Sequence, residues 1–267
     1  MECADCHNAH AVNDRPATAP DVSGRLDGAG GMTIERSAIK PALYEYEVCF
    51  KCHAELSQHT PFIPRVINNT NTQETFSELN PSSHPVVGAR NLNIPSIPSA
   101  YEPGLSGASM IYCTDCHSDN ADVPGASNGP HGSDYAPILK YQYETTDDFS
   151  PESPQKFALC YRCHDRNSIL NDESFTKNIN SNKGGHSDHL AAGATCAACH
   201  DAHGIVDDGG ITGSHTHLIN FSTLVVSPSN GNPFPLFNDN GPLNRSCTLV
   251  CHVKGVAYPH NSTNSLY

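Results

Sequence analysis

Residues 3–10 read CADCHNAH, and the core of this stretch, two cysteines followed directly by a histidine, returns five more times along the chain. Five of the six copies have the spacing Cys-x-x-Cys-His, and the sixth has one additional residue between its cysteines. The six motifs are Cys3, Cys6 and His7; Cys49, Cys52 and His53; Cys113, Cys116 and His117; Cys160, Cys163 and His164; Cys196, Cys199 and His200; and Cys247, Cys251 and His252. All 12 cysteines therefore belong to one repeated motif.

The spacing of this motif suits covalent attachment of haem. Residues i and i+3 of a helical turn are neighbours about 5–6 Å apart, so two thiols at these positions reach the two vinyl groups on one edge of a porphyrin. The following histidine lies over the same face, where it can bind the iron as the proximal axial ligand. The motifs predict six haem c groups held by 12 cysteines and six proximal histidines. In the sixth motif, the loop must bulge to keep both thioethers.

Other uses of paired cysteines explain the pattern less well. A zinc site needs four ligands per ion, and its geometry does not require a histidine directly after the second cysteine in six places. Six thioredoxin-like Cys-x-x-Cys units do not fit within 267 residues. Disulfide partners would be scattered rather than held at nearly fixed spacing. The haem interpretation is therefore favoured over zinc, redox dithiols and a disulfide scaffold.

The composition predicts a fold with little regular structure. Apolar residues make up 37% of the chain, below the roughly 45–50% of typical globular domains, tryptophan is absent, and 20 glycines and 20 prolines favour loops. We expect one domain over 1–267 that is mostly coil, with few short α-helices and minimal β-structure, organised around a stacked chain of six haems. The haems would replace a conventional core, so the chain without haem should not fold.

A few segments carry a local signal. Residues 42–56 and 153–164 are expected to be helices that carry attachment sites, the second with Ser153 as its cap. Residues 217–226 alternate like a strand. Residues 61–110 and 227–246 are rich in turn formers and are expected to be coil.

Ten histidines outside the motifs can supply the second axial ligands. Methionine, the other common axial ligand, occurs only three times, so bis-histidine coordination is expected. The predicted distal ligands are His10, His84, His131, His186, His189 and His203, with His217 and His260 as alternates; His59 and His215 are assigned to solvent or to hydrogen bonds. His10 and His203 each follow a proximal histidine by three residues and cannot cross that porphyrin plane, so each should reach a neighbouring haem.

These motifs resemble those of multihaem c-type cytochromes, with the doubled CxxCH family most similar. The resemblance implies haem attachment outside the cytoplasmic membrane, electron transfer as the task, and haem stacking as the organising principle. The N-terminal motif is similar to that of hexahaem outer-surface cytochromes that polymerise into filaments, and His10 matches the position where a histidine completes a haem of the adjacent subunit. This chain is more compact than those proteins, and its middle has no residue-by-residue match to them.

The filament resemblance implies an extracellular or cell-surface subunit that binds copies of itself head to tail and exchanges electrons with redox proteins or extracellular acceptors. A monomeric periplasmic shuttle would have the same haem chemistry. A multihaem reductase of nitrite, hydroxylamine or a sulfur oxyanion would need an open iron face, which the spare histidines can close, so we expect an electron carrier and not an enzyme.

Charge and hydropathy restrict the partners further. The net charge of −13 disfavours nucleic acids and anionic membrane surfaces. No run of 18 apolar residues is present, so no membrane span is expected. No leader peptide precedes Cys3, and we read the sequence as the mature form of an exported protein.

Overall fold

The computed structural model describes residues 2–54, 61–90, 93–97, 106–121, 123, 127–177, 184–229, 231–241, 245–253 and 256–260; for 252, 253 and 256–260 only the backbone is described. Most of these residues are coil. They include eight short α-helices and several small antiparallel sheets, so the expectation of low secondary structure is confirmed. The helices are α1 (Cys3–Cys6), α2 (Glu45–His53), α3 (Thr72–Thr75), α4 (Cys113–Cys116), α5 (Ala158–Tyr161), α6 (Arg166–Leu170), α7 (Gly185–Ala191) and α8 (Cys196–Cys199), with 3-10 turns η1 (Gly24–Leu26) and η2 (Thr216–Leu218).

The sheets are small and join distant segments. The first pairs β1 (Gly31–Met32) with β2 (Ala38–Ile39), and the second pairs β3 (Ser82–Ser83) with β4 (Gly204–Ile205). The largest has four strands: β5 (Val226–Ser227), β6 (Leu236–Asp239), β7 (Arg245–Val253) and β8 (Val256–His260). In it β7 is central, because β5, β6 and β8 all pair with it.

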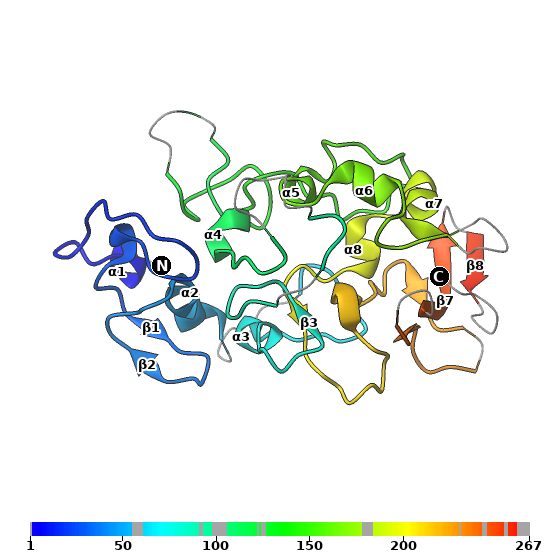
Figure 1. Ribbon diagram of the computed structural model, residues 1–267, viewed down its shortest axis with the longest axis horizontal. Helices are drawn as coiled ribbons and strands as arrows, with labels where there is room; N and C mark the ends of the chain where they lie inside the picture. The colour runs from blue at the N-terminus through cyan, green and yellow to red at the C-terminus, as the bar shows by residue number, and fades with distance from the viewer. Residues whose placement is uncertain are drawn as a thin grey trace.

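The attachment motifs follow the long axis of the molecule. Figure 1 places α1 and α2 at one end, α4, α5 and α8 in the middle, and β7 with β8 at the other end. Five of the six motifs have at least one cysteine on a helix, and the sixth lies on β7. The first and last motifs therefore lie at opposite ends of the protein.

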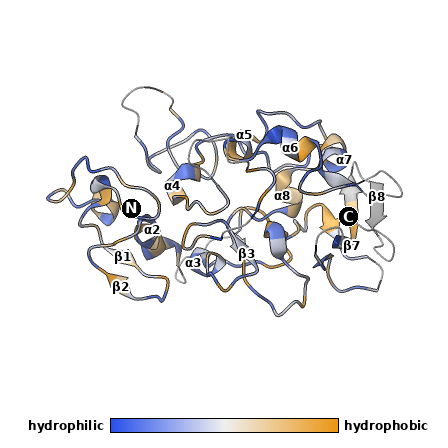
Figure 2. Cartoon of the chain, in the orientation of Figure 1, coloured by the Kyte–Doolittle hydropathy of each residue, from blue (hydrophilic) through white to orange (hydrophobic). Residues whose placement is uncertain are grey.

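The apolar core is divided into four small clusters, each of three or four buried residues. Each cluster packs against at least one motif cysteine: Cys6, Cys113, Cys160 and Cys199 are examples, one from each. Figure 2 shows the same division as short apolar segments distributed along the chain. The accessible surface is 14507 Å² for 28.6 kDa, whereas the usual scaling gives about 11,300 Å². The chain thus buries less of its surface than a typical monomer of its mass.

The two predicted motif helices are shorter in the structure. In place of 42–56, α2 covers Glu45–His53, Ala54 is extended, and 55–56 lie outside the described residues. In place of 153–164, only Ala158–Tyr161 form α5. The reason is competition from a neighbouring segment, because Leu159 donates its N–H to Gln142 O at 3.0 Å instead of to a helical partner.

The predictions of a strand at 217–226 and of coil at 227–246 were wrong in part. His217 and Leu218 have φ values of 58° and 61° and lie in η2, which breaks the alternation, and only Val226 enters β5. Within 227–246, β6 and the start of β7 pair in register, because Phe237 and Leu249 are buried together. Residues 61–110, where described, contain only α3 and β3 and are otherwise coil, as expected. No described helix has the length and apolar character needed to cross a membrane.

Candidate metal centres

Three attachment motifs fold as single helical turns: α1, α4 and α8. The first and third motifs read Cys-x-Asp-Cys, and in both the aspartate accepts the N–H of the residue before the first cysteine. Glu2 donates to Asp5 at 2.7 Å, and Tyr112 donates to Asp115 at 2.8 Å. These contacts are half of a capping box and start each turn at the cysteine. The histidine then leaves the helix in an extended conformation, so its ring projects away from the turn.

Four of the six motif histidines face a second histidine across a short gap. The ring centroids are 6.0 Å apart for His7 and His131 and for His117 and His203. They are 6.5 Å apart for His84 and His164 and 6.2 Å apart for His186 and His200. Two imidazoles that bind one metal through Nε2, with bonds of about 2 Å each, have centroids about 6 Å apart. The four pairs therefore have the spacing that a shared metal ion requires.

The hydrogen bonds of these rings leave Nε2 as the atom for a metal. Among the motif histidines, Nδ1 lies 2.8 Å from Arg25 O for His7, 3.3 Å from Pro137 O for His117, 2.8 Å from Ser96 Oγ for His164, and 2.9 Å from His217 O for His200. A carbonyl oxygen only accepts, so it fixes the proton on Nδ1 and the lone pair on Nε2. This is the arrangement that orients metal-binding imidazoles.

The opposing histidines follow the same pattern. Nδ1 of His84 lies 2.6 Å from Ala202 O, Nδ1 of His186 lies 3.4 Å from Ser174 Oγ, and Nδ1 of His131 contacts the hydroxyl of Ser127. The ring of His203 instead packs against Phe76, with centroids 5.4 Å apart. In three of the four opposing histidines, a hydrogen bond at Nδ1 thus orients the ring and leaves Nε2 for a metal.

Burial keeps several of these rings neutral. Desolvation lowers the pKa of His164, His200 and His203 to about 4 and that of His186 to about 3. Desolvation also lowers the pKa of His84 and His117. A neutral imidazole is the form that binds metal, so these rings are ready to bind without first losing a proton.

The two-stranded sheet of β3 and β4 positions two of the histidines that lie opposite motif histidines. His84 directly follows β3, and His203 directly precedes β4, which pairs with β3 through Ser83 and Gly204. The His84 N–H donates to His203 O at 2.9 Å, which fixes the two residues side by side. This two-stranded sheet therefore places the His84 ring opposite His164 and the His203 ring opposite His117, and so it connects the third and fourth motifs.

The cysteines of successive motifs meet along the chain. The pKa of Cys6 is raised by burial and by the thiols of Cys49 and Cys52 in the second motif. Cys49 is hydrogen bonded to Cys113 of the third motif, and the pKa of Cys113 is raised by this bond and by burial. The first three motifs thus adjoin one another in sequence order.

The later motifs continue this row. Burial raises the pKa of Cys116 to about 12, and Cys163 and Cys160 of the fourth motif add to the shift. Cys160 is hydrogen bonded to Cys196 of the fifth motif. Cys199 is in turn close to Cys247 and Cys251. All 12 cysteines are free thiols, and the six motifs form one continuous line.

The sixth motif differs in conformation. Cys247 and Cys251 lie on β7, where residues four apart share a face but are separated by about 13 Å, four steps of about 3.3 Å. Cysteines one helical turn apart are about 5–6 Å from each other. The predicted bulge is not present, and β7 would have to shorten locally to attach both cysteines to one porphyrin. The other five motifs need no such change.

Two buried charges lie beside the motifs. The guanidinium of Arg65, 7% exposed, donates to Ala197 O within the fifth motif and to Asn220 O, both at 2.7 Å, and its Nε is 3.9 Å from Asp201. Glu45, 5% exposed, has a carboxylate oxygen within 4.8 Å of the Sγ atoms of Cys49 and Cys113. A cation destabilises nearby ferric haem and an anion stabilises it, so the two residues would shift local potentials in opposite directions.

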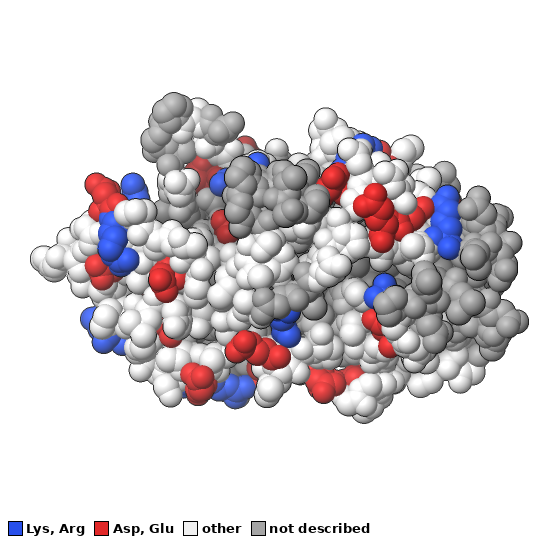
Figure 3. Space-filling view, in the orientation of Figure 1, with Lys and Arg blue, Asp and Glu red and all other residues white. Residues whose placement is uncertain are grey.

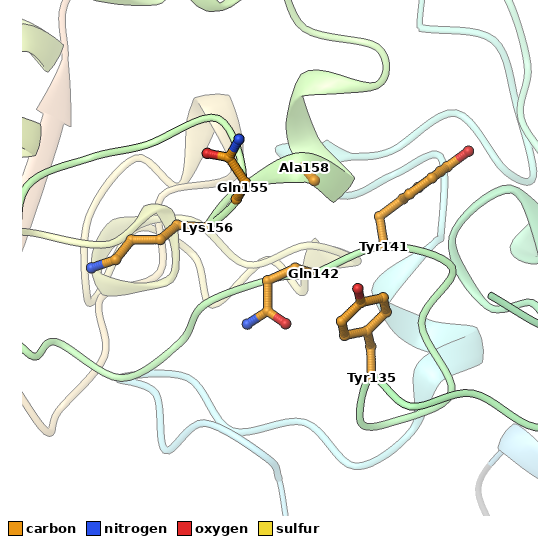
Figure 4. Close-up of a pocket in the computed structure, with 6 residues that line it drawn as sticks. All are labelled: Tyr135, Tyr141, Gln142, Gln155, Lys156 and Ala158. Carbon is orange, nitrogen blue, oxygen red and sulfur yellow. The ribbon is translucent and has the colours of Figure 1, made fainter. Parts of the chain in front are cut away.

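An open cavity of about 460 Å³ adjoins the third and fourth motifs. Its lining residues are Tyr135, Tyr141, Gln142, Gln155, Lys156 and Ala158. Figure 4 shows that they come from two facing segments, one of which leads into α5. The other begins beside α4, since Lys140 donates its N–H to Cys116 O at 2.8 Å. The cavity therefore leaves space next to two attachment sites.

The remaining predicted ligands have other surroundings. His10 is exposed near α1, and within the described part of the chain its ring makes no hydrogen bond or ring contact. Nδ1 of His189, on α7, lies 2.6 Å from Gly185 O. Nε2 of His217 bonds Asp239 at 2.9 Å, and His215 is buried with both ring nitrogens in hydrogen bonds, to Thr212 and Ile219.

The pairing of two motif histidines is not assigned. The side chains of His252 and His260, and all of His59, lie outside the described residues. His53 ends α2, and its charge lowers the pKa of His117, which is already reduced by burial. All the distal ligands, including those of the second and sixth motifs, therefore stay predictions.

Comparison with protein-family models, with curated proteins and with solved structures found no match to this chain. The functional argument therefore depends on the residues themselves. Sequence reasoning identified the cysteines and histidines, but it missed Arg65, Glu45 and the serines that contact imidazoles, because these residues are brought to the motifs by contacts between distant segments.

Proposed function

We propose that the chain is a c-type cytochrome that transfers electrons through six covalently attached haems, with two histidines at each iron. The observation that carries the proposal is the set of four histidine pairs with centroids 6.0–6.5 Å apart, each including the histidine of an attachment motif. When bound, the haems supply one-electron redox chemistry. The protein residues fix ligand identity, orientation and local charge.

The line of motifs supports a conduit. Because cysteines of successive motifs adjoin in order from the first to the sixth, the attached edges of successive haems would also adjoin. The first and last motifs are at opposite ends of the long axis (Figure 1). Electrons could then enter near one end and leave near the other, and no substrate pocket at an iron is needed.

The haem count and iron ligation are the first test. A pyridine haemochrome assay of protein produced with haem attachment should give six haems per chain, and the reduced protein should not bind carbon monoxide, because two imidazoles close each iron. A count of five haems per chain would indicate that the sixth motif keeps its strand conformation and holds no haem. Zinc in place of iron, or carbon monoxide binding at several haems, would refute the proposal.

We further propose that copies assemble head to tail into an extracellular filament, with His10 as a ligand to a haem of the adjacent subunit. His10 is exposed beside the first motif, at one end of the line, where a neighbouring copy could reach it. A head-to-tail contact that does not close gives a helical polymer. On the face in Figure 3, the acidic and basic side chains of the described residues are interspersed.

The substitution His10→Ala tests the filament. We expect short polymers or none by negative-stain microscopy, and altered ligation at one haem per chain by electron paramagnetic resonance. The control is Leu79→Ala, which shortens a side chain that is 91% exposed and cannot bind iron, and this variant should polymerise normally. Normal filaments from His10→Ala would show that His10 is not the ligand between subunits, whereas a wild type that forms no filaments would favour the monomeric periplasmic shuttle.

A further inference from the structure

Glu45 is a buried carboxylate at the junction of two attachment motifs. It is the first residue of α2, which carries the second motif, and its side chain reaches α4, which carries the third. Its Oε1 accepts the N–H of Thr114 at 3.1 Å. A carboxylate oxygen and the Sγ atoms of Cys49 and Cys113 all lie within 4.8 Å of one another. The carboxylate therefore lies near the attachment atoms of both motifs, within 4.8 Å of each.

The capping requirements of α2 do not explain this burial. Glu47, two residues later, is also buried, but its Oε2 accepts two N–H groups at the helix start, from Leu43 at 2.7 Å and Tyr44 at 3.1 Å. Glu47 thus has a structural role. Glu45 makes no such bond to its own helix and points into the junction. The bond from Thr114 satisfies an N–H in the first turn of α4, but a neutral amide oxygen could accept it equally well, so this contact does not require an ionisable side chain. A buried ionisable group that the fold does not require in charged form is a candidate for a functional role.

Burial, with a smaller contribution from a neighbouring carboxylate, favours the neutral form of Glu45. From α4 it faces Thr114, Asp115 and Cys113, from its own helix Cys49, and nearby Tyr112. No described lysine or arginine forms an ion pair with it. Burial raises its pKa to about 7; the Thr114 hydrogen bonds oppose the shift and Asp115 adds to it.

We propose that Glu45 takes up one proton from water when the second or third haem accepts an electron, and releases it on oxidation. This inference depends on the proposed haem function. The two sulfurs would bond porphyrin carbons and not iron, so the carboxylate would lie at the edges of two porphyrins. Reduction of a haem held there, by one electron from an external donor, would remove one positive charge beside the carboxylate. The carboxylate then gains a proton and becomes a carboxylic acid, which restores the local charge.

The sign of the pH dependence follows. Well below pH 7, Glu45 is protonated in both redox states and the potential does not depend on this group. At higher pH it is ionised in the ferric state, and the loss of ferric charge on reduction favours proton uptake. The potential of the adjacent haems should therefore fall as the pH rises, by at most about 59 mV per pH unit when one proton accompanies one electron.

The test is spectroelectrochemical titration of the haem-loaded protein between about pH 5 and pH 9. The wild type should show a falling potential above about pH 6 in up to two of its haems, and Glu45→Gln should make those potentials pH-independent. Gln keeps the acceptor oxygen for Thr114. The control is Asp14→Asn, which removes a carboxylate whose side chain is 97% exposed and should keep the slope.

A second measurement reads protonation directly. The redox-difference infrared spectrum of the wild type should contain a carboxylic-acid C=O band that appears on reduction and is missing in Glu45→Gln. Flat potentials in a wild type that carries its haems, or a slope and a band that survive in Glu45→Gln, would overturn the inference. A chain without haem would overturn the proposed function instead, and the haemochrome assay separates these cases.

Discussion

Produced without haem attachment, the chain is expected to show no cooperative unfolding transition, whereas the haem-loaded protein should unfold cooperatively. The reason lies in the size of the core. The apolar clusters contain three or four buried residues each, and each packs against motif cysteines. Without haem, these clusters would have to hold a mostly coil chain against a backbone entropy cost of about 1–2 kcal/mol per ordered residue.

The proposed haem attachment would change this balance in two ways. Each porphyrin would add apolar surface, whose burial stabilises by about 25 cal/mol per Å². Each would also link two cysteines and two histidines, which would restrict the unfolded chain as other crosslinks do. The histidine pairs join distant segments, for example His7 with His131 and His84 with His164, so the links close long loops.

The measurement is thermal unfolding followed by circular dichroism for the two forms, together with a pair of double variants. Cys49→Ala with Cys52→Ala removes an attachment in the interior of the line, and Cys3→Ala with Cys6→Ala removes the terminal one. The interior pair should lower the melting temperature more, because α2 packs on α3 and α4. A sharp unfolding transition in the haem-free chain would refute the argument.

The local conformation of most Cys-x-x-Cys motifs followed from the sequence more closely than that of the segments around them. The Cys-x-x-Cys turns α1, α4 and α8 are local structures, and the aspartates of the first and third motifs supply their own capping contacts. The length of α5 could not be predicted, because the competing bond from Leu159 goes to Gln142 in a separate segment. Local patterns do not contain such pairings.

The same limit applies to the candidate site. Residue spacing shows that His203 cannot turn back to its own motif, and the structure places it opposite His117. Spacing alone cannot indicate that His84 lies beside His203, because the pairing of β3 with β4 joins distant parts of the chain. Glu45 and Arg65 belong to the same class of residue, whose importance depends on which segment they meet.

Gly204→Ala is expected to disturb two metal centres at once. Gly204 belongs to β4, and a Cβ atom on it would lie 2.1 Å from Thr75 O and 2.6 Å from Ser83 Cβ. Thr75 O is a backbone atom at the end of α3 and cannot swing aside. The added methyl group must therefore separate β4 from β3 or from α3, at a cost of about 1–3 kcal/mol in unfolding free energy.

Separation of β3 from β4 would displace both His84 and His203. The bond from His84 N to His203 O holds their backbones together, and Nδ1 of His84 bonds Ala202 O, one residue before His203. Movement of β4 therefore changes the approach of His203 to His117 and that of His84 to His164. In the haem-loaded protein, the third and fourth irons should change in part from low-spin to high-spin, and up to two haems per chain should bind carbon monoxide.

The matched control is Gly30→Ala, because a Cβ atom there meets only Ile39 O, at 3.8 Å. It should keep the wild-type spectrum and bind no carbon monoxide. Carbon monoxide difference spectra, with the bound gas counted per haem, distinguish the two variants. A Gly204→Ala protein with all its haems, a wild-type spectrum and no carbon monoxide binding would show that the sheet of β3 and β4 does not position the ligands. Carbon monoxide binding at the third and fourth haems together, rather than at one, would show that this sheet positions the distal histidines of both.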